Sequence, residues 1–345
     1  MKFGIMISRK MIDRGAVDPY AKLSSHLNEM EDLGYDLGWC GHHRFSSSTA
    51  FGGDTASEPA APLIMLSALL ARTRKMKMCT NIMLLPAYHP VQIAEEINTL
   101  NEMSNNRFIL GAGIGYKPDE YEHVGRDFKT RARRFEECLE VLRLALTGRE
   151  FSYTGKHFNI TSCTVVPPPL RGHAPPLWIG AVSEPGMLRA GRLADGWLIS
   201  FAEHLIELQS KIARYRTVAR EHGRPSTLCL MRDLHIAPTK KAVDVNWLPN
   251  IIKVWQSYDD LGAKADRDEL ANQVMFGGKP TTLEEFAPNR AIVGTPEDCA
   301  TEMLRIKEVI NPEYVFLTPT GVPDPDQQIK ELRLFAKEVM PAFVS

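Results

Sequence analysis

Residues 76–112 read MKMCTNIMLLPAYHPVQIAEEINTLNEMSNNRFILGA, and their pattern decides the fold. Residues 76–84 and 107–112 are short, nearly continuous apolar runs, as strands buried on both faces require. Between them, His89-Pro90 places proline at a first helical position, and Ile93, Ile97 and Leu100 follow at helical spacing. This stretch therefore predicts a strand, a helix and a second strand.

The same alternation extends over the rest of the chain. Further strands are predicted at residues 2–7, 36–40, 176–181, 196–200, 228–236 and 313–317, which makes eight in all. Helix start signals lie between them, such as Asp18-Pro19 and Thr295-Pro296. A chain of 345 residues has room for two domains or for one large barrel. Eight alternating strands favour the α/β class and a single (β/α)8 TIM barrel over residues 1–345.

Two connections are longer than those of a minimal barrel. Residues 113–175, after the fourth strand, contain a predicted helix at 130–147 and a hairpin at 150–158. Residues 258–290, after the seventh strand, contain Gly277-Gly278-Lys279-Pro280 and little periodicity. Because loops after barrel strands lie at the catalytic face, this second insertion is predicted to be a mobile lid, with a helical decoration as the alternative.

Composition excludes several classes of function. The chain has 41 Lys and Arg against 42 Asp and Glu and no long basic stretch, so no nucleic-acid partner is expected. Its apolar runs fall far short of the roughly 20 residues of a membrane span, and it does not open like a signal peptide, which predicts a cytoplasmic protein with no membrane partner. The six cysteines stand far apart without a CxxC, so reduced thiols are expected. With neither HExxH nor HxxxH, no metal site is expected.

Three groups of residues near strand ends are candidates for chemistry. Gly111-Ala112-Gly113-Ile114-Gly115 follows the fourth strand and offers backbone N–H groups to an anion, although a tight turn alone also explains it. His42-His43 ends the second strand, where an imidazole acts as a general acid or base or forms a hydrogen bond at the barrel mouth. Ser183 precedes a predicted helix, either as a plain N-cap or as a phosphate ligand.

Charged residues inside apolar stretches give two further predictions. Arg232-Asp233 interrupts an apolar strand, so one of the two side chains is expected to face inward, and the pattern does not show which. Glu95 and Arg107 are predicted to form an ion pair that ties the third helix to the fourth strand.

Longer motifs resemble the bacterial luciferase-like flavin-dependent monooxygenase family. The segment LPAYHPVQIAEE at 85–96, running on to Arg107-Phe108, is the most specific of them. WCGHHRF at 39–45, PLWIG at 176–180, ADGW at 194–197 and VGTPED at 293–298 continue the similarity over almost the whole chain. The resemblance implies a TIM barrel that binds FMN, arriving reduced, at its mouth.

The resemblance also implies roles for single residues at the strand ends. His42 matches the histidine that assists formation or breakdown of the flavin peroxide in this family. Asn81-Ile82 falls where the family carries a non-prolyl cis peptide beneath the flavin ring. The other expected cofactor contacts form the phosphate pocket and an aromatic position near the ring, and they are Gly113, Ile114, Gly115, Ser183 and Phe201.

Two positions depart from the family pattern. Gly41 stands where luciferase-like enzymes often have an acidic residue, so a different orientation of His42 is expected. Ile114 stands where the light-emitting enzymes have a phosphate-binding arginine. A phosphate must then be met by helix ends, backbone N–H groups or another cation, which argues against light emission and leaves the wider family intact.

The activity that the resemblance implies is that of a two-component oxidoreductase. Reduced FMN, supplied by a separate NAD(P)H:flavin reductase, reacts with dioxygen to give a flavin hydroperoxide, and a small organic substrate takes one oxygen atom. Family habit also implies a homodimer. One alternative is a deazaflavin-dependent oxidoreductase that transfers hydride without oxygen, and a second is a non-catalytic flavin-binding protein.

Overall fold

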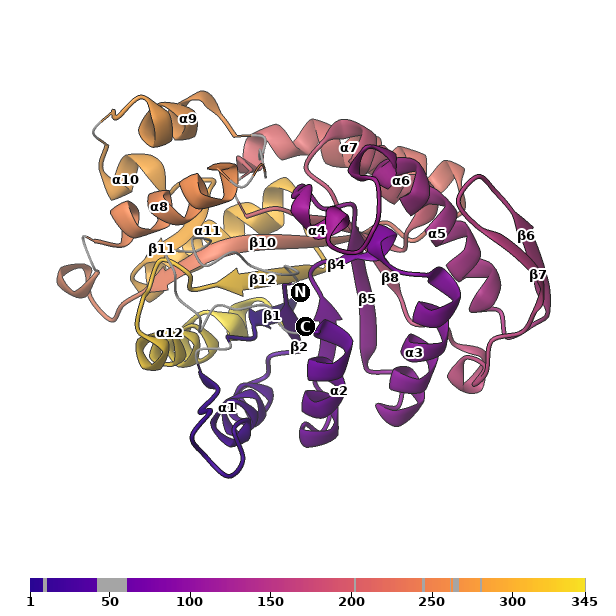
Figure 1. Ribbon diagram of the computed structural model, residues 1–345. Helices are drawn as coiled ribbons and strands as arrows, with labels where there is room; N and C mark the ends of the chain where they lie inside the picture. Colours follow the sequence, from indigo (N-terminus) through magenta and orange to yellow (C-terminus); the bar gives the residue numbers. More distant parts are fainter. Residues whose placement is uncertain are drawn as a thin grey trace.

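A closed barrel of parallel strands forms the centre of the molecule (Figure 1). The computed structural model describes residues 1–8, 11–41, 61–201, 203–243, 246–260, 262, 267–279 and 281–344. Within these ranges each barrel strand pairs in parallel with its neighbour, and the last strand pairs with the first, which confirms the predicted TIM barrel. In spatial order the strands are β1 (Lys2–Met6), β2 (Leu37–Cys40), β3 (Lys77–Thr80), β5 (Phe108–Gly113), β8 (Leu177–Gly180), β9 (Gly196–Ile199), β10 (Thr227–Ile236) and β12 (Tyr314–Thr318).

Alternate strand residues point inward and fill the barrel. The buried members of this inner layer are Leu37, Trp39, Cys79, Ile109, Trp178, Leu198, Cys229, Tyr314 and Phe316. Gly4 of β1 makes room for the large rings, since a Cβ there would lie 2.7 Å from Phe316 Cδ1. Trp39 stacks on Phe316 with ring centroids 6.1 Å apart, so the interior is a packed core and not a channel.

Helices surround the barrel and bury the outward faces of the strands (Figure 1). They are α1 (Ala21–Asp32), α2 (Pro62–Arg72), α3 (Pro90–Met103), α5 (Arg131–Ala145), α6 (Glu184–Leu193), α7 (Leu205–Glu221), α11 (Pro296–Val309) and α12 (Pro325–Glu338). The predicted start signals hold for α3 and α11: His89 precedes Pro90, and Thr295 forms a capping box with Asp298. The two ends of the chain meet, because the Met1 amino group donates a hydrogen bond of 3.1 Å to the Phe343 carbonyl.

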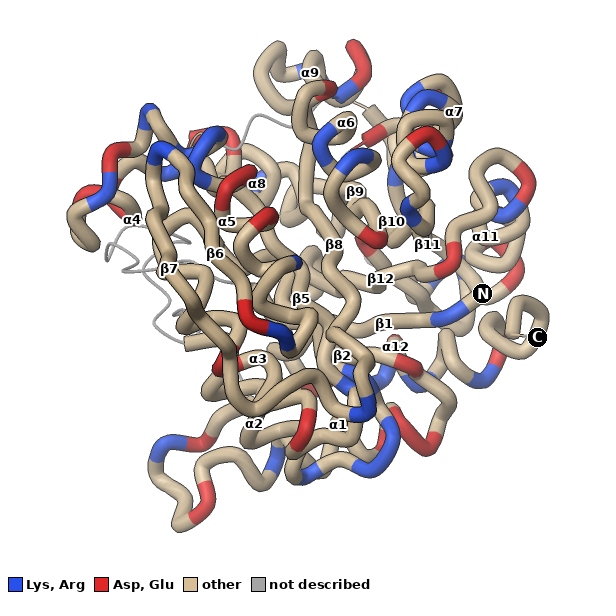
Figure 2. Tube along the Cα trace, turned by 90° about the vertical axis from the view of Figure 1, so that its right-hand side faces the viewer, with Lys and Arg blue, Asp and Glu red and all other residues tan. Residues whose placement is uncertain are grey.

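The insertion after β5 carries α4 (Asp119–Glu122), α5 and an antiparallel hairpin of β6 (Phe151–Thr154) and β7 (Asn159–Cys163). The hairpin was predicted in the right place and is longer than residues 150–158. Figure 2 shows it lying along one side of the molecule, beside α5. On the face seen in that view, acidic and basic residues are interspersed on the outer elements. No described helix is long and apolar enough to cross a membrane.

The insertion after β10 is largely helical where the structure describes it. It contains α8 (Trp247–Asp260), α9 (Glu269–Phe276) and α10 (Leu283–Phe286), grouped beside β11 (Ala291–Gly294) in Figure 1. In the described part of residues 258–290, the end of α8 and the short helices α9 and α10 agree with the helical alternative, and the mobile lid stays a prediction. Strand β11, which the sequence did not indicate, pairs with the end of β10 outside the barrel ring.

Candidate active site

The residues predicted to form the site all follow the carboxyl ends of barrel strands. Asn81 comes directly after β3, Gly113 ends β5, Ser183 lies between β8 and α6, and Phe201 is two residues beyond β9. Because all barrel strands are parallel, these ends open on the same face, where TIM-barrel enzymes carry their active sites. His42 lies outside the described residues, two positions after the end of β2.

The peptide between Asn81 and Ile82 is cis, as the resemblance implied. It interrupts the predicted strand at 76–84, so that β3 ends at Thr80 and a second short strand, β4 (Met83–Leu84), pairs with β5. The Asn81 backbone N–H donates a hydrogen bond of 2.7 Å to the Cys40 carbonyl, and its side-chain amide lies 3.0 Å from Met231 Sδ. Asn81 is therefore held between the end of β2 and Met231 of β10.

The Ile82 side chain fits into a slot made by two glycines. A Cβ on Gly113 would lie 2.3 Å from Ile82 Cδ1, and a Cβ on Gly180 would lie 2.6 Å from Ile82 Cγ2. Real Cβ atoms do not approach other heavy atoms so closely, so both positions require glycine while Ile82 stays in place. The structure thus gives Gly113 a packing role that is independent of any ligand.

Beyond β5 the backbone turns at Gly115, which has a φ of +66°. In the described residues, no hydrogen bond uses the backbone N–H of Ile114 or Gly115. The side chain of Ile114 is half-buried and packs against the outer core. These two N–H groups are available to an anion, while Ile114 itself brings no charge to the site.

Ser183 occupies the N-cap position of α6, and its hydroxyl makes no capping hydrogen bond. This differs from Thr295 at the start of α11, whose hydroxyl accepts from the Asp298 N–H. The Ser183 hydroxyl and the first-turn N–H groups of α6 are the kind of donor set that binds phosphate at a helix N-terminus. The Ser183 region therefore offers hydrogen-bond donors of the kind that suit a phosphate group.

Aromatic side chains from α8 and α10 gather around Phe201. The Phe201 ring lies 6.1 Å from Trp255 and 5.6 Å from Tyr258, and Trp255 lies 5.4 Å from Phe286 (centroid distances). Phe201 is partly buried against this cluster. The structure therefore joins the predicted ring-side aromatic to the insertion after β10, a contact that the sequence pattern did not indicate.

Asp233 is a further buried polar group at this end of the barrel. It follows Cys229 and Met231 on the inward-facing side of β10, in register with Thr318 of β12. Burial raises the pKa of Asp233 to about 6, although hydrogen bonds from Thr318, Thr320 and Trp255 favour the ionised form. A carboxyl group with such a pKa can hold or release a proton near neutrality.

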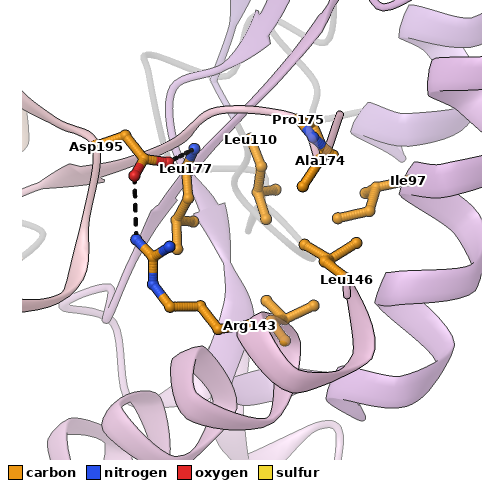
Figure 3. Close-up of a pocket in the computed structure, with 9 residues that line it drawn as sticks. Ile97, Leu110, Arg143, Leu146, Ala174, Pro175, Leu177 and Asp195 are labelled. Carbon is orange, nitrogen blue, oxygen red and sulfur yellow. Dashed lines mark hydrogen bonds and ion pairs between the residues drawn. The ribbon is translucent and has the colours of Figure 1, made fainter. Parts of the chain in front are cut away.

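Two cavities lie away from these residues. A cavity of about 270 Å³ lies between α3, α5 and the beginning of β8, at the opposite end of the barrel. Figure 3 shows Arg143 reaching Asp195 beside it, an ion pair of 3.2 Å, while Asp195 also accepts from the Leu177 N–H at 2.9 Å. A cavity of about 480 Å³ lies among α8, α9 and α10. In the described ranges, no three His, Cys, Asp or Glu side chains form a group that could hold a metal ion.

The sequence of the chain is similar to that of a known family. The family described as luciferase-like monooxygenase matches residues 1–310. The alkanal monooxygenase alpha chain of Photorhabdus luminescens is 22% identical over 326 residues, which cover 90% of this chain and 88% of that protein.

Solved structures show the same fold with different cofactors. The FMN complex of the oxygenating constituent of 3,6-diketocamphane monooxygenase from Pseudomonas putida superposes with a TM-score of 0.74 at 19% identity, over 100% of this chain and 99% of that one. An F420-dependent secondary alcohol dehydrogenase in complex with an F420-acetone adduct gives 0.75 at 18% identity, with the same coverage. The family match covers most of the chain, and the chain therefore belongs to the luciferase-like monooxygenase family.

Proposed function

We propose that this protein is a flavin-dependent monooxygenase that uses reduced FMN and dioxygen to oxygenate a small organic substrate. The observation that carries the proposal is the uncapped hydroxyl of Ser183 at the α6 N-terminus, on the barrel face that also carries the cis peptide Asn81-Ile82. The family match supports the reaction class. Reduced flavin would come from a separate NAD(P)H:flavin reductase, and this partner and the homodimer stay predictions.

The residues at the mouth have distinct expected tasks toward FMN. Ser183 and the backbone N–H groups of Ile114 and Gly115 would hold the phosphate, because Ile114 itself brings no charge where the light-emitting enzymes have an arginine. The Asn81-Ile82 peptide would support the ring system, and Phe201 would flank it. When bound, reduced FMN supplies the electrons with which dioxygen is activated.

Water exclusion and proton transfer are the tasks of the protein itself. The aromatic cluster around Phe201 and Trp255 is apolar and lies over the ends of β9 and β10, so it would keep bulk water from the reacting atoms. His42 is proposed to donate or accept the proton that is transferred during oxygenation of the substrate, because an imidazole titrates near neutral pH.

Hydride transfer with a deazaflavin coenzyme is the second candidate. Two F420-dependent enzymes superpose with TM-scores of 0.75 and 0.72, one above and one below the 0.74 of the FMN enzyme. A non-catalytic flavin-binding protein is the third candidate, and it predicts that flavin binds without any turnover.

A stopped-flow experiment separates these candidates. The protein is loaded anaerobically with reduced FMN and mixed with oxygenated buffer while the flavin absorbance is recorded. Oxidation through a distinct transient absorbance that outlives the oxidation of free flavin is the expected result. A time course identical to that of free FMN would contradict the monooxygenase proposal, and deazaflavin binding would then be titrated.

His42→Ala tests the proton-transfer assignment in the same experiment. We expect FMN affinity to be kept and the lifetime of the transient to change by about 10²- to 10⁴-fold, the usual size of a general acid–base contribution. His173→Ala is the matched control, because it removes an exposed imidazole that precedes β8 at the opposite end of the barrel. If His42→Ala leaves binding and every measured turnover unchanged, the assignment is wrong.

A further inference from the structure

Asp233 lies where the barrel ends and the second insertion begins. It is 1% exposed, and its side chain points into the barrel at the mouth. It lies two residues after Met231, whose sulfur contacts Asn81. Arg232, the adjacent charge, has the opposite direction on the strand and donates to the carbonyls of Met231 (3.0 Å) and Phe201 (3.5 Å). Among the described residues no cation forms an ion pair with Asp233, and burying such a carboxylate is costly, so its other contacts must explain its position.

Three donors surround the two oxygen atoms of Asp233. The hydroxyl of Thr320 donates to Oδ1 at 2.9 Å, and the indole N–H of Trp255 donates to Oδ2 at 3.0 Å. The Thr318 hydroxyl lies 2.9 Å from Oδ1 and also 2.9 Å from the Arg232 carbonyl, so its one proton is shared. The indole is the one donor in this set that comes from the insertion, since both threonines belong to β12 and the residues just after it.

Trp255 is the centre of the packing that holds α8 in place. Its side chain is fully buried between Phe201 and Phe286, and the Arg267 guanidinium lies 5.7 Å from the ring centroid. Arg267 in turn pairs with Asp259 at the end of α8 at 2.7 Å. Loss of the hydrogen bond from the indole N–H is therefore expected to loosen the whole of α8, the first helix of the insertion.

We propose that Asp233 is a positioning residue that latches α8 over the barrel mouth through the indole N–H of Trp255, and thereby sets Phe201 and Tyr258 beside the cofactor. The latch itself stands on contacts within the described residues. Only the position of the cofactor beneath α8 rests on the proposed function.

The latch has a pH dependence whose sign follows from the position of Asp233. Besides the threonines and Trp255, the groups that act on it electrostatically are Arg232 on its own strand and Tyr258 on α8. The pKa of Asp233 is about 6 in the closed arrangement, and detaching α8 exposes the carboxyl to water, which returns it toward 3.8. Closure is therefore favoured by protonation, and it weakens as the pH rises from 4 to 6.

Hydrogen–deuterium exchange of the full chain without cofactor tests the latch. Trp255→Phe keeps a ring and removes the N–H, and it should speed exchange in α8 about tenfold while β2 and β5 stay unchanged. Trp247→Phe is the matched control: this second buried indole of α8 has no hydrogen-bond partner for its N–H in the described structure, so the variant measures the cavity cost of the change alone. Exchange of α8 should speed less in Trp247→Phe than in Trp255→Phe, and equal acceleration in the two variants would overturn the proposal. Unchanged α8 exchange in Trp255→Phe, or equal acceleration in β2 and β5, would overturn the proposal.

Asp233→Asn separates the hydrogen bonds of Asp233 from its titration, because it keeps the former and removes the latter. Its amide oxygen can accept from Trp255 while its NH2 donates to the threonine hydroxyls, so α8 protection should be kept. After correction for intrinsic exchange, protection in the wild type should fall between pH 4 and pH 6, and in Asp233→Asn it should not. If the protein shows these effects but binds no FMN, only the proposed function is contradicted. If it binds FMN and lacks these effects, only the latch is contradicted.

Discussion

Ser183 shows how one hydroxyl distinguishes a structural from a functional helix start. An N-cap side chain that bonds the first turn stabilises a protein by about 1 kcal/mol, and the Ser183 hydroxyl makes no such bond. Capping therefore gives this hydroxyl no structural role. A phosphate at the α6 N-terminus would use both the hydroxyl and the first-turn N–H groups.

Ser183→Ala should therefore weaken FMN binding without loosening the fold. Loss of one hydrogen bond to a charged group corresponds to about 1.5–3 kcal/mol, or roughly a tenfold to hundredfold higher Kd. We expect an unchanged thermal midpoint for this variant. Fluorescence titration with FMN and thermal unfolding check the two halves of the prediction.

Thr295→Ala provides the opposite pattern as a control. Its hydroxyl caps α11 in a complete capping box, so its loss should cost about 1 kcal/mol of stability and leave FMN affinity unchanged. A Ser183→Ala protein that loses stability like Thr295→Ala, with normal FMN affinity, would make Ser183 an ordinary cap.

Single charged residues were the hardest to predict from sequence. The Arg107 guanidinium donates to the carbonyls of Ser104, Met76 and Leu70 and to the Thr73 hydroxyl, so the predicted pair with Glu95 was wrong. The Arg232-Asp233 motif was expected to send one side chain inward, and that is Asp233. Strand register and the packing of α8 decide such directions, and neither is visible in a local pattern.

At the scale of secondary structure, the strands and helices of the barrel follow directly from the sequence. Continuous apolar runs locate all eight barrel strands, because both strand faces are buried. Strand β11 was missed, since its four residues pair only with the end of β10. Helical structure in residues 258–290 was predicted only as an alternative and without bounds, because α9 and α10 span only eight and four residues, too short for a periodic signal.

The glycine slot around Ile82 gives a prediction at this scale, because it fastens β5 and β8 to the segment after β3. Gly113→Ala and Gly180→Ala should each destabilise the protein by about 1–3 kcal/mol through overpacking. The two clashes involve different atoms of Ile82, Cδ1 for Gly113 and Cγ2 for Gly180. Urea unfolding of the single and double variants measures them separately.

Ile82→Val and Ile82→Ala distinguish the two contacts. Valine lacks the Cδ1 atom and should rescue Gly113→Ala, whereas it keeps both γ carbons and should not rescue Gly180→Ala. Alanine lacks all of these atoms and should relieve both clashes, apart from its own cavity cost. Rescue of both glycine variants by Ile82→Val alone would show that the slot is not built as described.

At the scale of the whole molecule, two buried groups make opposite contributions to acid stability. Burial lowers the pKa of His26 in α1 to about 4, and burial raises the pKa of Asp233 to about 6. The unfolded chain binds a proton at His26 near pH 6.5, before the folded protein does, so His26 makes the fold less stable as the pH falls from 6.5 to 4. Asp233 does the reverse: the folded protein binds its proton first, so its contribution is largest below pH 3.8 and is lost as the pH rises to 6.

Each group accounts for up to about 3 kcal/mol across its range, since one pKa unit corresponds to about 1.4 kcal/mol, and between pH 4 and 6 the two slopes oppose each other. Relative to the wild type, Asp233→Asn should gain stability as the pH rises over this interval, and His26→Leu should gain stability as it falls. Urea unfolding of the three proteins at pH 4.5, 5.25 and 6 measures the two differences, in which other titrating groups cancel. Differences of the same sign for both variants would show that the burial of one of these groups does not control its titration in the folded protein.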